Sequence, residues 1–243
     1  MSELRILPLA GLPEIRESDD LAALVAGVIE LEDGDVVVLA QKIVSKAEGR
    51  VVRLDDIEPS QRARELATED DDPRHIEAIL RESKRIVRTR GSLVIAETQH
   101  GFVCASAGVD ASNAPEAGTL VLLPLDPDGS ARMIRRRLRV LTTRTVAVII
   151  SDSFGRPWRQ GTTDVAIGTA GLVPLLDLRG RRDASGYELR STQIAVADEL
   201  AGAAELVMGK DGAVPGAVIR GFAATGDGSA QDLVMPAHRD LFR

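Results

Sequence analysis

Residues 145–159 read TVAVIISDSFGRPWR, and this stretch decides the class of fold. Its first half is apolar and rich in β-branched residues, which is typical of a buried β-strand. Asp152 follows that apolar run directly, and the only tryptophan of the chain, Trp158, lies between Arg156 and Arg159. The stretch therefore predicts a buried strand over residues 145–152 that carries a carboxylate at its end.

Further strands are predicted on both sides of this stretch. The segments RILPLA (5–10), DVVVLA (35–40), TLVLLP (119–124) and GAVIRGF (216–222) are short apolar runs. SLVIAET (92–98) and FVCASAGVD (102–110) flank a short polar turn, as in a β-hairpin. Residues 154–190 are rich in Gly and Arg, and we expect them to be irregular.

Helices are predicted between these strands. Ser18 is a candidate N-cap for a helix that contains Leu21 and Val25, and Asp72 with Pro73 predicts the start of a helix over 71–83. Other helical patterns cover 59–67, 131–141 and 192–208. Because helices and strands mix without strict alternation, we predict an α+β fold rather than a regular parallel α/β sheet.

Composition excludes several classes of protein. The 243 residues are 44% hydrophobic and 28% charged, which indicates a globular chain. A net charge of −7 argues against a general nucleic-acid binder. A single cysteine, Cys104, cannot form an internal disulfide, and we interpret it as a buried structural thiol. No apolar run approaches the ~20 residues of a membrane span, and we see no signal peptide, so we expect a cytoplasmic protein without a membrane partner.

Two aspartates end apolar segments, Asp110 in AGVD and Asp152 in VIISD. A carboxylate at the end of a buried strand is held rigidly while its oxygens reach solvent, which suits Mg²⁺ or Mn²⁺ bound jointly with phosphates. Each aspartate alone could equally cap a turn. Lys42 and Lys46, after the strand at 35–40, either bind phosphate or belong to a solvated helix turn.

The glycine-rich segment VMGKDGAVPGAVIRG (207–221) could bring backbone N–H groups close to phosphate oxygens, or it could be an ordinary turn. It matches neither the P-loop pattern nor GxGxxG. Residue chemistry alone thus favours a metal-assisted enzyme that acts on phosphates.

In order along the chain, GLPEI, QKIVSKAEGR, AGVDASN, SDSFGRPWRQGTTDVAIG, DLRGRRDASGYEL, VADELAGAAELVMGK and VPGAVIRG resemble the coenzyme F420-0:L-glutamate ligase (F420 gamma-glutamyl ligase) family. The resemblance runs from about residue 5 to residue 222. It implies a two-part α+β fold that is neither Rossmann nor P-loop. It also implies a single ligase unit over 1–243, with two intertwined subdomains, no C-terminal nitroreductase-like domain and a homodimeric assembly.

The activity implied by the resemblance is GTP- and divalent-metal-dependent addition of L-glutamate to coenzyme F420-0, followed by further γ-linked glutamates. The carboxylate would first become an acyl phosphate, because a carboxylate oxygen is a poor leaving group. The glutamate amine would then attack. Mg²⁺ or Mn²⁺ would neutralise charge on the triphosphate.

Site residues are carried over from the family by motif. The implied metal ligands are Asp110 and Asp152 for one ion and Ser153 for a second. The implied nucleotide contacts are Leu12, Pro13, Glu14, Ile15, Gln41, Lys46, Asn113, Met208, Gly209, Lys210, Asp211, Gly212, Ala213, Val214 and Pro215. Many members have Ser at the position of Gln41. Some offer Gln or Glu as a metal ligand where this chain has Lys210, and a protonated lysine cannot coordinate a cation.

Two points stay open from the sequence. Arg156, Trp158 and Arg159 are candidate substrate contacts on a cleft wall, whereas a core tryptophan that stacks on arginine is the alternative. The function could also be that of a metal-dependent phosphotransferase or ligase for another carboxylate. A third possibility is a non-catalytic GTP-binding partner of a reductase.

Overall fold

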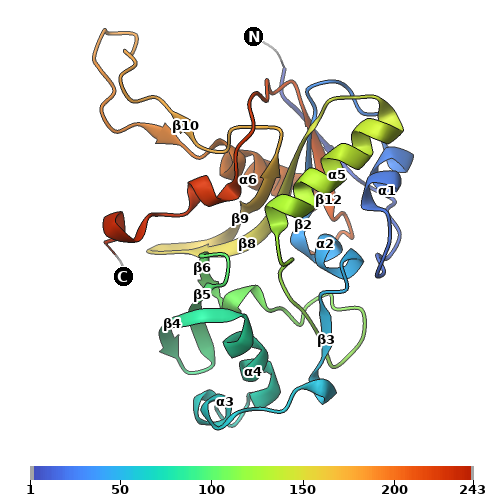
Figure 1. Cartoon of the computed structure of the whole chain (residues 1–243), viewed down its shortest axis with the longest axis vertical. Coiled ribbons are helices and arrows are strands. Elements are labelled where there is room, and N and C mark those ends of the chain that lie inside the picture. Colours follow the sequence, from blue (N-terminus) through green and yellow to red (C-terminus); the bar gives the residue numbers. More distant parts are fainter. Residues whose placement is uncertain (1–2, 242–243) are drawn as a thin grey trace.

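A five-stranded mixed sheet forms the centre of the molecule in a computed structural model that describes residues 3–241 (Figure 1). Its strand order is β1 (Arg5–Pro8), β12 (Gly216–Arg220), β2 (Val36–Ala40), β8 (Ala147–Arg156) and β9 (Arg159–Ala170). Within this sheet β2 and β8 pair in parallel, and the other neighbours are antiparallel. Side chains of β2 and of the first half of β8 are buried on both faces, which explains the continuous apolar sequence of these segments.

Helices cover both faces of this sheet. One face packs on α1 (Leu21–Val28), α2 (Gln41–Ala47) and α5 (Pro127–Thr142) around Val37, Leu39 and Ile150. The other face packs on α6 (Val196–Met208), whose alanines lie close to Val38 and Ile149. The alanine-rich sequence of α6 allows this close approach, because small side chains bring the helix axis near the sheet.

A smaller part with its own core lies below the sheet in Figure 1. It holds the strand pair β3 (Val51–Arg53) and β7 (Thr119–Val121), and a sheet of β4 (Ser83–Arg90), β5 (Leu93–Thr98) and β6 (Val103–Ala105). Its helices are α3 (Gln61–Leu66) and α4 (Pro73–Glu82), and short 3-10 turns lie at Leu54–Asp56 and Ser106–Gly108. The chain enters this part after α2 and leaves it before α5. The smaller part is therefore joined to the sheet by two segments of chain.

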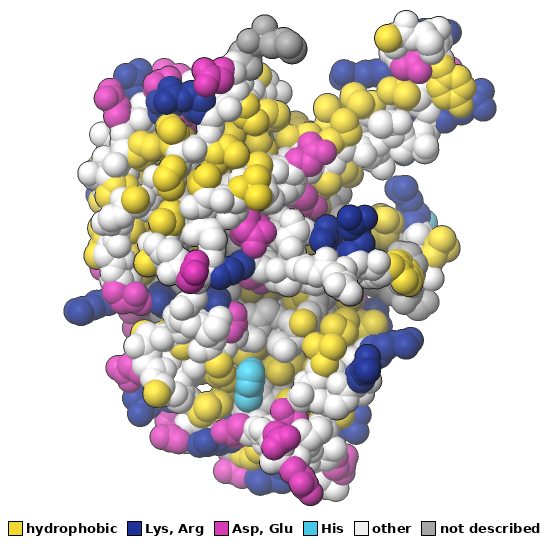
Figure 2. Space-filling view, turned by 180° about the vertical axis from the view of Figure 1, so that it is seen from behind, with side chains coloured by type: hydrophobic (Ala, Val, Ile, Leu, Met, Phe, Trp, Pro, Cys, Tyr) yellow, Lys and Arg dark blue, Asp and Glu magenta, His cyan; other side chains and the backbone are white. Residues whose placement is uncertain are grey.

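A narrow segment projects from the sheet. It contains the two-stranded pair β10 (Leu176–Asp177) and β11 (Gln193–Ile194), and it stands apart from the body in Figures 1 and 2. The exposed residues between these strands include Arg181, Arg182 and Tyr187. The last described elements are the 3-10 turns Ala230–Leu233 and Ala237–Arg239.

Most predicted elements are confirmed, including the mixed α+β class and the cap of α4. Asp72 accepts a hydrogen bond from the N–H of Arg74, and Pro73 is the first residue of that helix. The N-cap of α1 was wrong: Asp20, not Ser18, accepts from the N–H of Ala23. Ser18 has a φ of 70°, so the chain turns once more before the helix begins.

The expectation of an irregular region over 154–190 was also wrong in its first part. β8 continues to Arg156, and β9 runs back from Arg159 as a long hairpin. Pairing with β8 supplies the hydrogen bonds that stabilise this Gly- and Thr-containing strand, and its own composition does not reveal them. β4 was likewise not predicted, because half of its sequence SKRIVRTR is charged.

Cys104 is buried in β6, as predicted. Burial raises the pKa of its thiol to about 12, and the negative charge of Asp152 acts in the same direction. In the part of the chain that the structure describes, no helix is both long enough and apolar enough to cross a membrane.

Gly168 allows α5 to sit against β9. A Cβ at this position would lie 2.4 Å from the backbone oxygen of Pro127, the first residue of α5. The next residue of the helix, Asp128, is buried and accepts hydrogen bonds from the N–H groups of Thr169 and Ala230. The start of α5 is therefore fixed on β9 by the hydrogen bonds of Asp128 and by a backbone contact at Gly168 that leaves no space for a side chain there.

We expect Gly168→Ala to lower the free energy of unfolding by about 1–3 kcal/mol, because backbone must move to accept the methyl group. Chemical denaturation would measure the change. Gly155→Ala is the matched control on the same hairpin, since a Cβ there meets nothing within 4 Å. That variant should be unchanged or more stable by about 0.4–1 kcal/mol. Equal destabilisation of both variants would contradict the close approach.

Candidate functional site

At one edge of the sheet, the carboxyl end of β2 lies beside the middle of β8, because β8 continues to Arg156 after its pairing with β2 ends at Ser151. Their parallel register pairs Ala40 with Ser151, so the first residues of α2 lie beside Asp152. The N–H of Ala40 donates to the backbone oxygen of Pro215, 2.9 Å away, which holds the end of the 209–215 loop at the same edge. Three segments that are distant in sequence therefore meet around Asp152.

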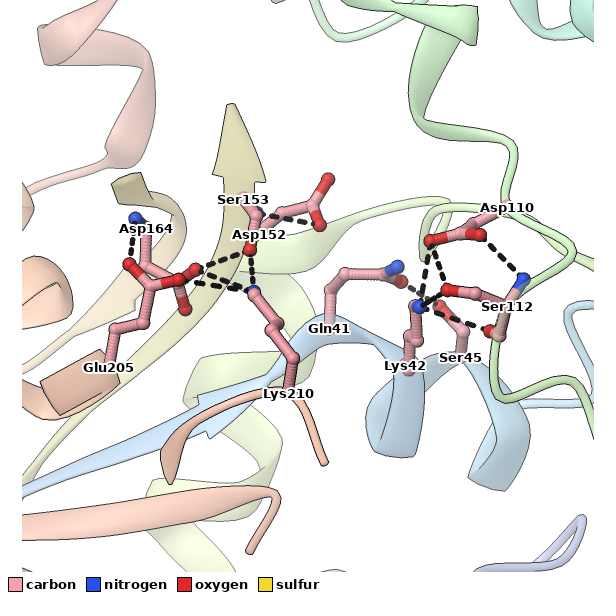
Figure 3. Close-up of polar contacts among 10 residues, drawn as sticks. All are labelled: Gln41, Lys42, Ser45, Asp110, Ser112, Asp152, Ser153, Asp164, Glu205 and Lys210. Carbon is pink, nitrogen blue, oxygen red and sulfur yellow. Dashed lines mark hydrogen bonds and ion pairs between the residues drawn. The ribbon is translucent and has the colours of Figure 1, made fainter. Parts of the chain in front are cut away.

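Asp110 lies on one side of this edge, in an ion pair with Lys42 (Figure 3). The Lys42 Nζ to Asp110 Oδ2 distance is 2.7 Å. Ser112 donates its backbone N–H and its hydroxyl to Asp110, at 2.6 and 3.0 Å. Burial raises the pKa of Asp110, but Lys42 and Ser112 outweigh this effect and lower the pKa overall. Asp110 is therefore ionised at neutral pH.

Asp152 lies between two groups of charged side chains (Figure 3). Its Oδ1 accepts the backbone N–H of Ser153 at 2.9 Å. Burial, together with the negative charges of Asp164 and Asp110, raises the pKa of Asp152 to about 7, although the hydrogen bond from Ser153 and the charge of Lys42 act in the opposite direction. The ionised form is therefore poorly compensated by the protein itself, as at a position prepared for a cation.

On the other side of Asp152, Lys210 contacts two carboxylates and one hydroxyl. Its Nζ lies 3.3 Å from Asp164 Oδ1 and 3.2 Å from Glu205 Oε1, and it also donates to Ser153 Oγ. Burial lowers the pKa of Lys210, but the charges and hydrogen bonds of Asp164 and Glu205 outweigh it and raise the pKa. Lys210 is therefore a fixed positive charge next to the site.

Asp164 is the centre of this second group. It is 4% exposed, and it accepts the hydroxyls of Ser151 and Ser153 at 2.9 and 2.5 Å. Its backbone N–H donates to Glu205 Oε2 at 3.0 Å. These hydrogen bonds connect β8, β9 and α6, so the positions of these side chains are set by the packing of the three elements.

Two of the predicted nucleotide contacts, Glu14 and Lys46, lie together. Lys46 Nζ and Glu14 Oε1 are 2.5 Å apart, with Lys46 buried and Glu14 exposed. Ile15 is buried in the main core, and Leu12 packs at its margin. Pro13 is exposed beside them. In this short loop, the exposed positions Pro13 and Glu14 are therefore the ones open to a ligand.

Gln41 is 2% exposed, and its Oε1 accepts the hydroxyl of Ser45 at 2.8 Å. Its side chain lies between Lys42 and Lys210 in Figure 3, within the wall of the site. Asn113 is exposed in the loop after Asp110, with a φ of 53°. Their predicted nucleotide contacts stay predictions.

The segment from Met208 to Pro215 begins in the core and then runs along the surface. Met208 is buried at the end of α6, and Gly209 follows with a φ of 62° that ends the helix. The turn formed by Asp211, Gly212 and Ala213 is exposed, whereas Val214 and Pro215 are half-buried where they approach β2. The structure thus brings this loop to the aspartates, as the phosphate interpretation requires.

Arg156, Trp158 and Arg159 lie at the tip of the β8–β9 hairpin. Trp158 is 81% exposed and has a φ of 56°, so it is not a core residue. Arg156 donates to the backbone oxygen of Gln160 and closes the turn. The turn begins five residues beyond Asp152, roughly 16 Å along the strand. The alternative of a core tryptophan is therefore wrong, and within one chain these residues lie away from Asp152. Their predicted substrate contacts stay predictions.

Sequence reasoning missed Ser112, Asp164 and Glu205 as site residues. A two-residue turn at Pro157 and Trp158 would have predicted the hairpin, but it would have paired Ser153 with Thr162. A register shift between Gly155 and Arg156 changes this pairing, and no local sequence pattern predicts that shift. The observed register pairs Asp164 with Ser153. Lys42 was predicted either to bind phosphate or to belong to a solvated helix turn. Its pairing with Asp110 spans 68 sequence positions that no local pattern relates.

The donor set suits one divalent cation. Mg²⁺ is commonly held by one or two carboxylates together with phosphate oxygens and water, and Asp110 and Asp152 provide such a pair. Among residues 3–241, no three or more His, Cys, Asp or Glu side chains group closely enough to hold a metal alone. Ser153 does not fit a second ion, because its hydroxyl donates to Asp164 and accepts from Lys210.

Comparison with known proteins shows the family of this chain. Residues 11–221 match the family model described as F420-0:Gamma-glutamyl ligase. The chain is 48% identical to the coenzyme F420:L-glutamate ligase of Methanopyrus kandleri, with 99% of this chain and 98% of that protein covered. It is 45% identical to the protein of that name from Methanothermobacter thermautotrophicus, with 99% of both covered. Against the Archaeoglobus fulgidus protein it is 43% identical, with 99% and 96% covered.

These matches extend over almost the whole chain and confirm the resemblance drawn from its motifs. The chain belongs to the F420-0:gamma-glutamyl ligase family.

Proposed function

We propose that this protein is a GTP- and divalent-metal-dependent ligase that joins L-glutamate to coenzyme F420-0 and adds further γ-linked glutamates. The observation that carries the proposal is the meeting of Asp110, Asp152 and the 209–215 loop at one edge of the sheet, in a chain of this family. The relatives' names supply the substrates, coenzyme F420 and L-glutamate.

The reaction needs no nucleophile from the protein. A carboxylate oxygen of F420-0 attacks the γ-phosphorus of GTP, the bond to the β-phosphate oxygen breaks, and GDP leaves. The amine of glutamate then attacks the acyl phosphate carbon, phosphate leaves, and the nitrogen loses a proton to form the amide. The site we describe contains no serine or cysteine activated by a base, which agrees with a role in positioning and charge compensation.

Asp110 and Asp152 would hold the divalent cation, which when bound supplies charge neutralisation for the triphosphate. Lys42 and Lys46 extend from one turn of α2 and would place positive charge near phosphate oxygens. In the chain as it stands, both ammonium groups are held by carboxylates, Asp110 and Glu14. A triphosphate would compete for these ammonium groups, which links nucleotide binding to release of the two carboxylates.

The direct test is incubation with F420-0, L-glutamate, GTP and Mn²⁺. We expect products heavier than F420-0 by whole glutamyl units, with one or two additions dominant, and faster turnover with GTP than with ATP. Mass spectrometry reads both the reaction and the number of additions. Unchanged F420-0 from a preparation that binds GTP and metal would overturn the assignment.

The same experiment separates the other candidate functions. A ligase releases phosphate from GTP only when both F420-0 and glutamate are present. Phosphate release with a different carboxylate in place of F420-0 would indicate a ligase or phosphotransferase of other specificity. Tight GTP binding without phosphate release under any substrate would indicate a binding partner of a reductase.

We expect Asp152→Asn to keep the fold and to lower turnover by at least about 100-fold, since losing even an outer partner of a metal ligand costs about 10–100-fold. The substitution removes the negative charge and preserves the shape. Steady-state kinetics at several Mn²⁺ concentrations would measure the loss. Asp55→Asn is the control, because Asp55 is an exposed aspartate of the smaller part. Full activity of Asp152→Asn would remove this residue from the site.

The assembly expected from the family is a homodimer. Exposed apolar side chains on the projecting parts of the chain support it, namely Trp158 on the β8–β9 turn and Tyr187 between β10 and β11. Size-exclusion chromatography with light scattering should give twice the 25.9 kDa chain mass at micromolar concentration. Trp158→Ala should shift the sample toward monomer. A wild-type monomer at that concentration would contradict the proposal.

A further inference from the structure

We infer that the ammonium group of Lys210 takes the place of a second metal ion, so that the site of this protein binds one divalent cation where its carboxylates could otherwise support two. The inference rests on the proposed function only in assuming that the first cation binds at Asp110 and Asp152.

The first observation is the set of oxygens directed at Lys210. Its Nζ contacts Asp164 Oδ1 at 3.3 Å, Glu205 Oε1 at 3.2 Å and Ser153 Oγ (Figure 3). These oxygens come from β9, α6 and β8, and hard cations prefer oxygen ligands of this kind. One ammonium therefore occupies the position where the oxygens of three elements converge.

The second observation concerns the hydroxyl of Ser153. It donates its proton to Asp164 Oδ1 at 2.5 Å, which leaves its lone pairs for the donor Lys210. A cation ligated by this hydroxyl would have to displace the ammonium. Ser151 gives the other oxygen of Asp164 a hydrogen bond at 2.9 Å, so the carboxylate is held in place and cannot turn away from Lys210.

Charge then decides the occupant. Asp164 and Glu205 carry two negative charges, and Lys210 leaves one of them uncompensated. An incoming divalent ion would meet a positive charge at the distance of a ligand, and this repulsion opposes binding. Without Lys210, two negative charges would face the same space, which favours a divalent cation. The lysine side chain is 60% exposed, so its tip can be changed without opening the core.

The experiment counts Mn²⁺ bound per chain by equilibrium dialysis, with Mn²⁺ alone and with Mn²⁺ plus a non-hydrolysable GTP analogue. After subtraction of the Mn²⁺ carried by free analogue, we expect one ion per chain for the wild type and two for Lys210→Gln. The second ion of Lys210→Gln should bind at least about tenfold more tightly than any further ion on the wild type. Lys210→Arg keeps the positive charge and should stay at one ion.

Lys84→Gln is the matched control. Lys84 Nζ lies 3.3 Å from Glu97 Oε1, and the two side chains are 61% and 5% exposed, nearly the same as Lys210 and Asp164. Glu97 also pairs with Arg85, so its charge stays compensated after the substitution. This variant should bind one ion. Thermal unfolding of every variant checks that the fold is retained.

Two ions on the wild type, no gain on Lys210→Gln, or an equal gain on Lys84→Gln would each overturn the inference. None of these counts depends on turnover. If F420-0 is not converted while the counts are one and two, the proposed reaction fails and the inference stands. If F420-0 is converted while the wild type binds two ions, the reaction stands and the inference fails.

Discussion

The parallel pairing of β2 with β8 is the constraint on which the rest of the structure depends. Where they pair, both strands are buried on both faces, and their register pairs Ala40 with Ser151. β2 ends at this pair whereas β8 continues, so the start of α2 lies beside the residues of β8 that follow Ser151. The antiparallel partners β12 and β9 then bring the 209–215 loop and Asp164 to that edge. A change in this register would move the start of α2 away from Asp152.

Charge at this edge is arranged in two groups on either side of Asp152. Lys42 compensates Asp110 on one side, and Lys210 compensates Asp164 and Glu205 on the other. Asp152 lies between them with a pKa near 7, because burial and the surrounding negative charges oppose its ionisation. Each lysine comes from an element other than that of its carboxylate, so folding itself assembles the balance of charge. A cation bound beside such an uncompensated carboxylate would stabilise its ionised form.

The long β8–β9 hairpin has two different regions. Near the sheet its residues form the acidic group, and at its far end the turn carries exposed arginines and a tryptophan. The composition of this stretch suggested a single functional cleft, but a strand separates its residues in space. Residues that are continuous in sequence therefore belong to two separate regions of the structure. The exposed turn is suited to contact with another molecule rather than to chemistry at Asp152.

The sequence by itself determined the α+β class, most of the elements, the family, and Asp110 and Asp152 as carboxylates at the ends of apolar segments. These features are local, because hydrophobic periodicity, caps and motifs act within a few residues. Only the tertiary structure decided that Lys42 pairs with Asp110 and that Lys210 faces Asp164 and Glu205. It also showed that Trp158 lies on an exposed turn and not in the core. Pairing between strands and docking of helices set these distances, and they depend on contacts between segments tens of residues apart that no local pattern of side chains specifies.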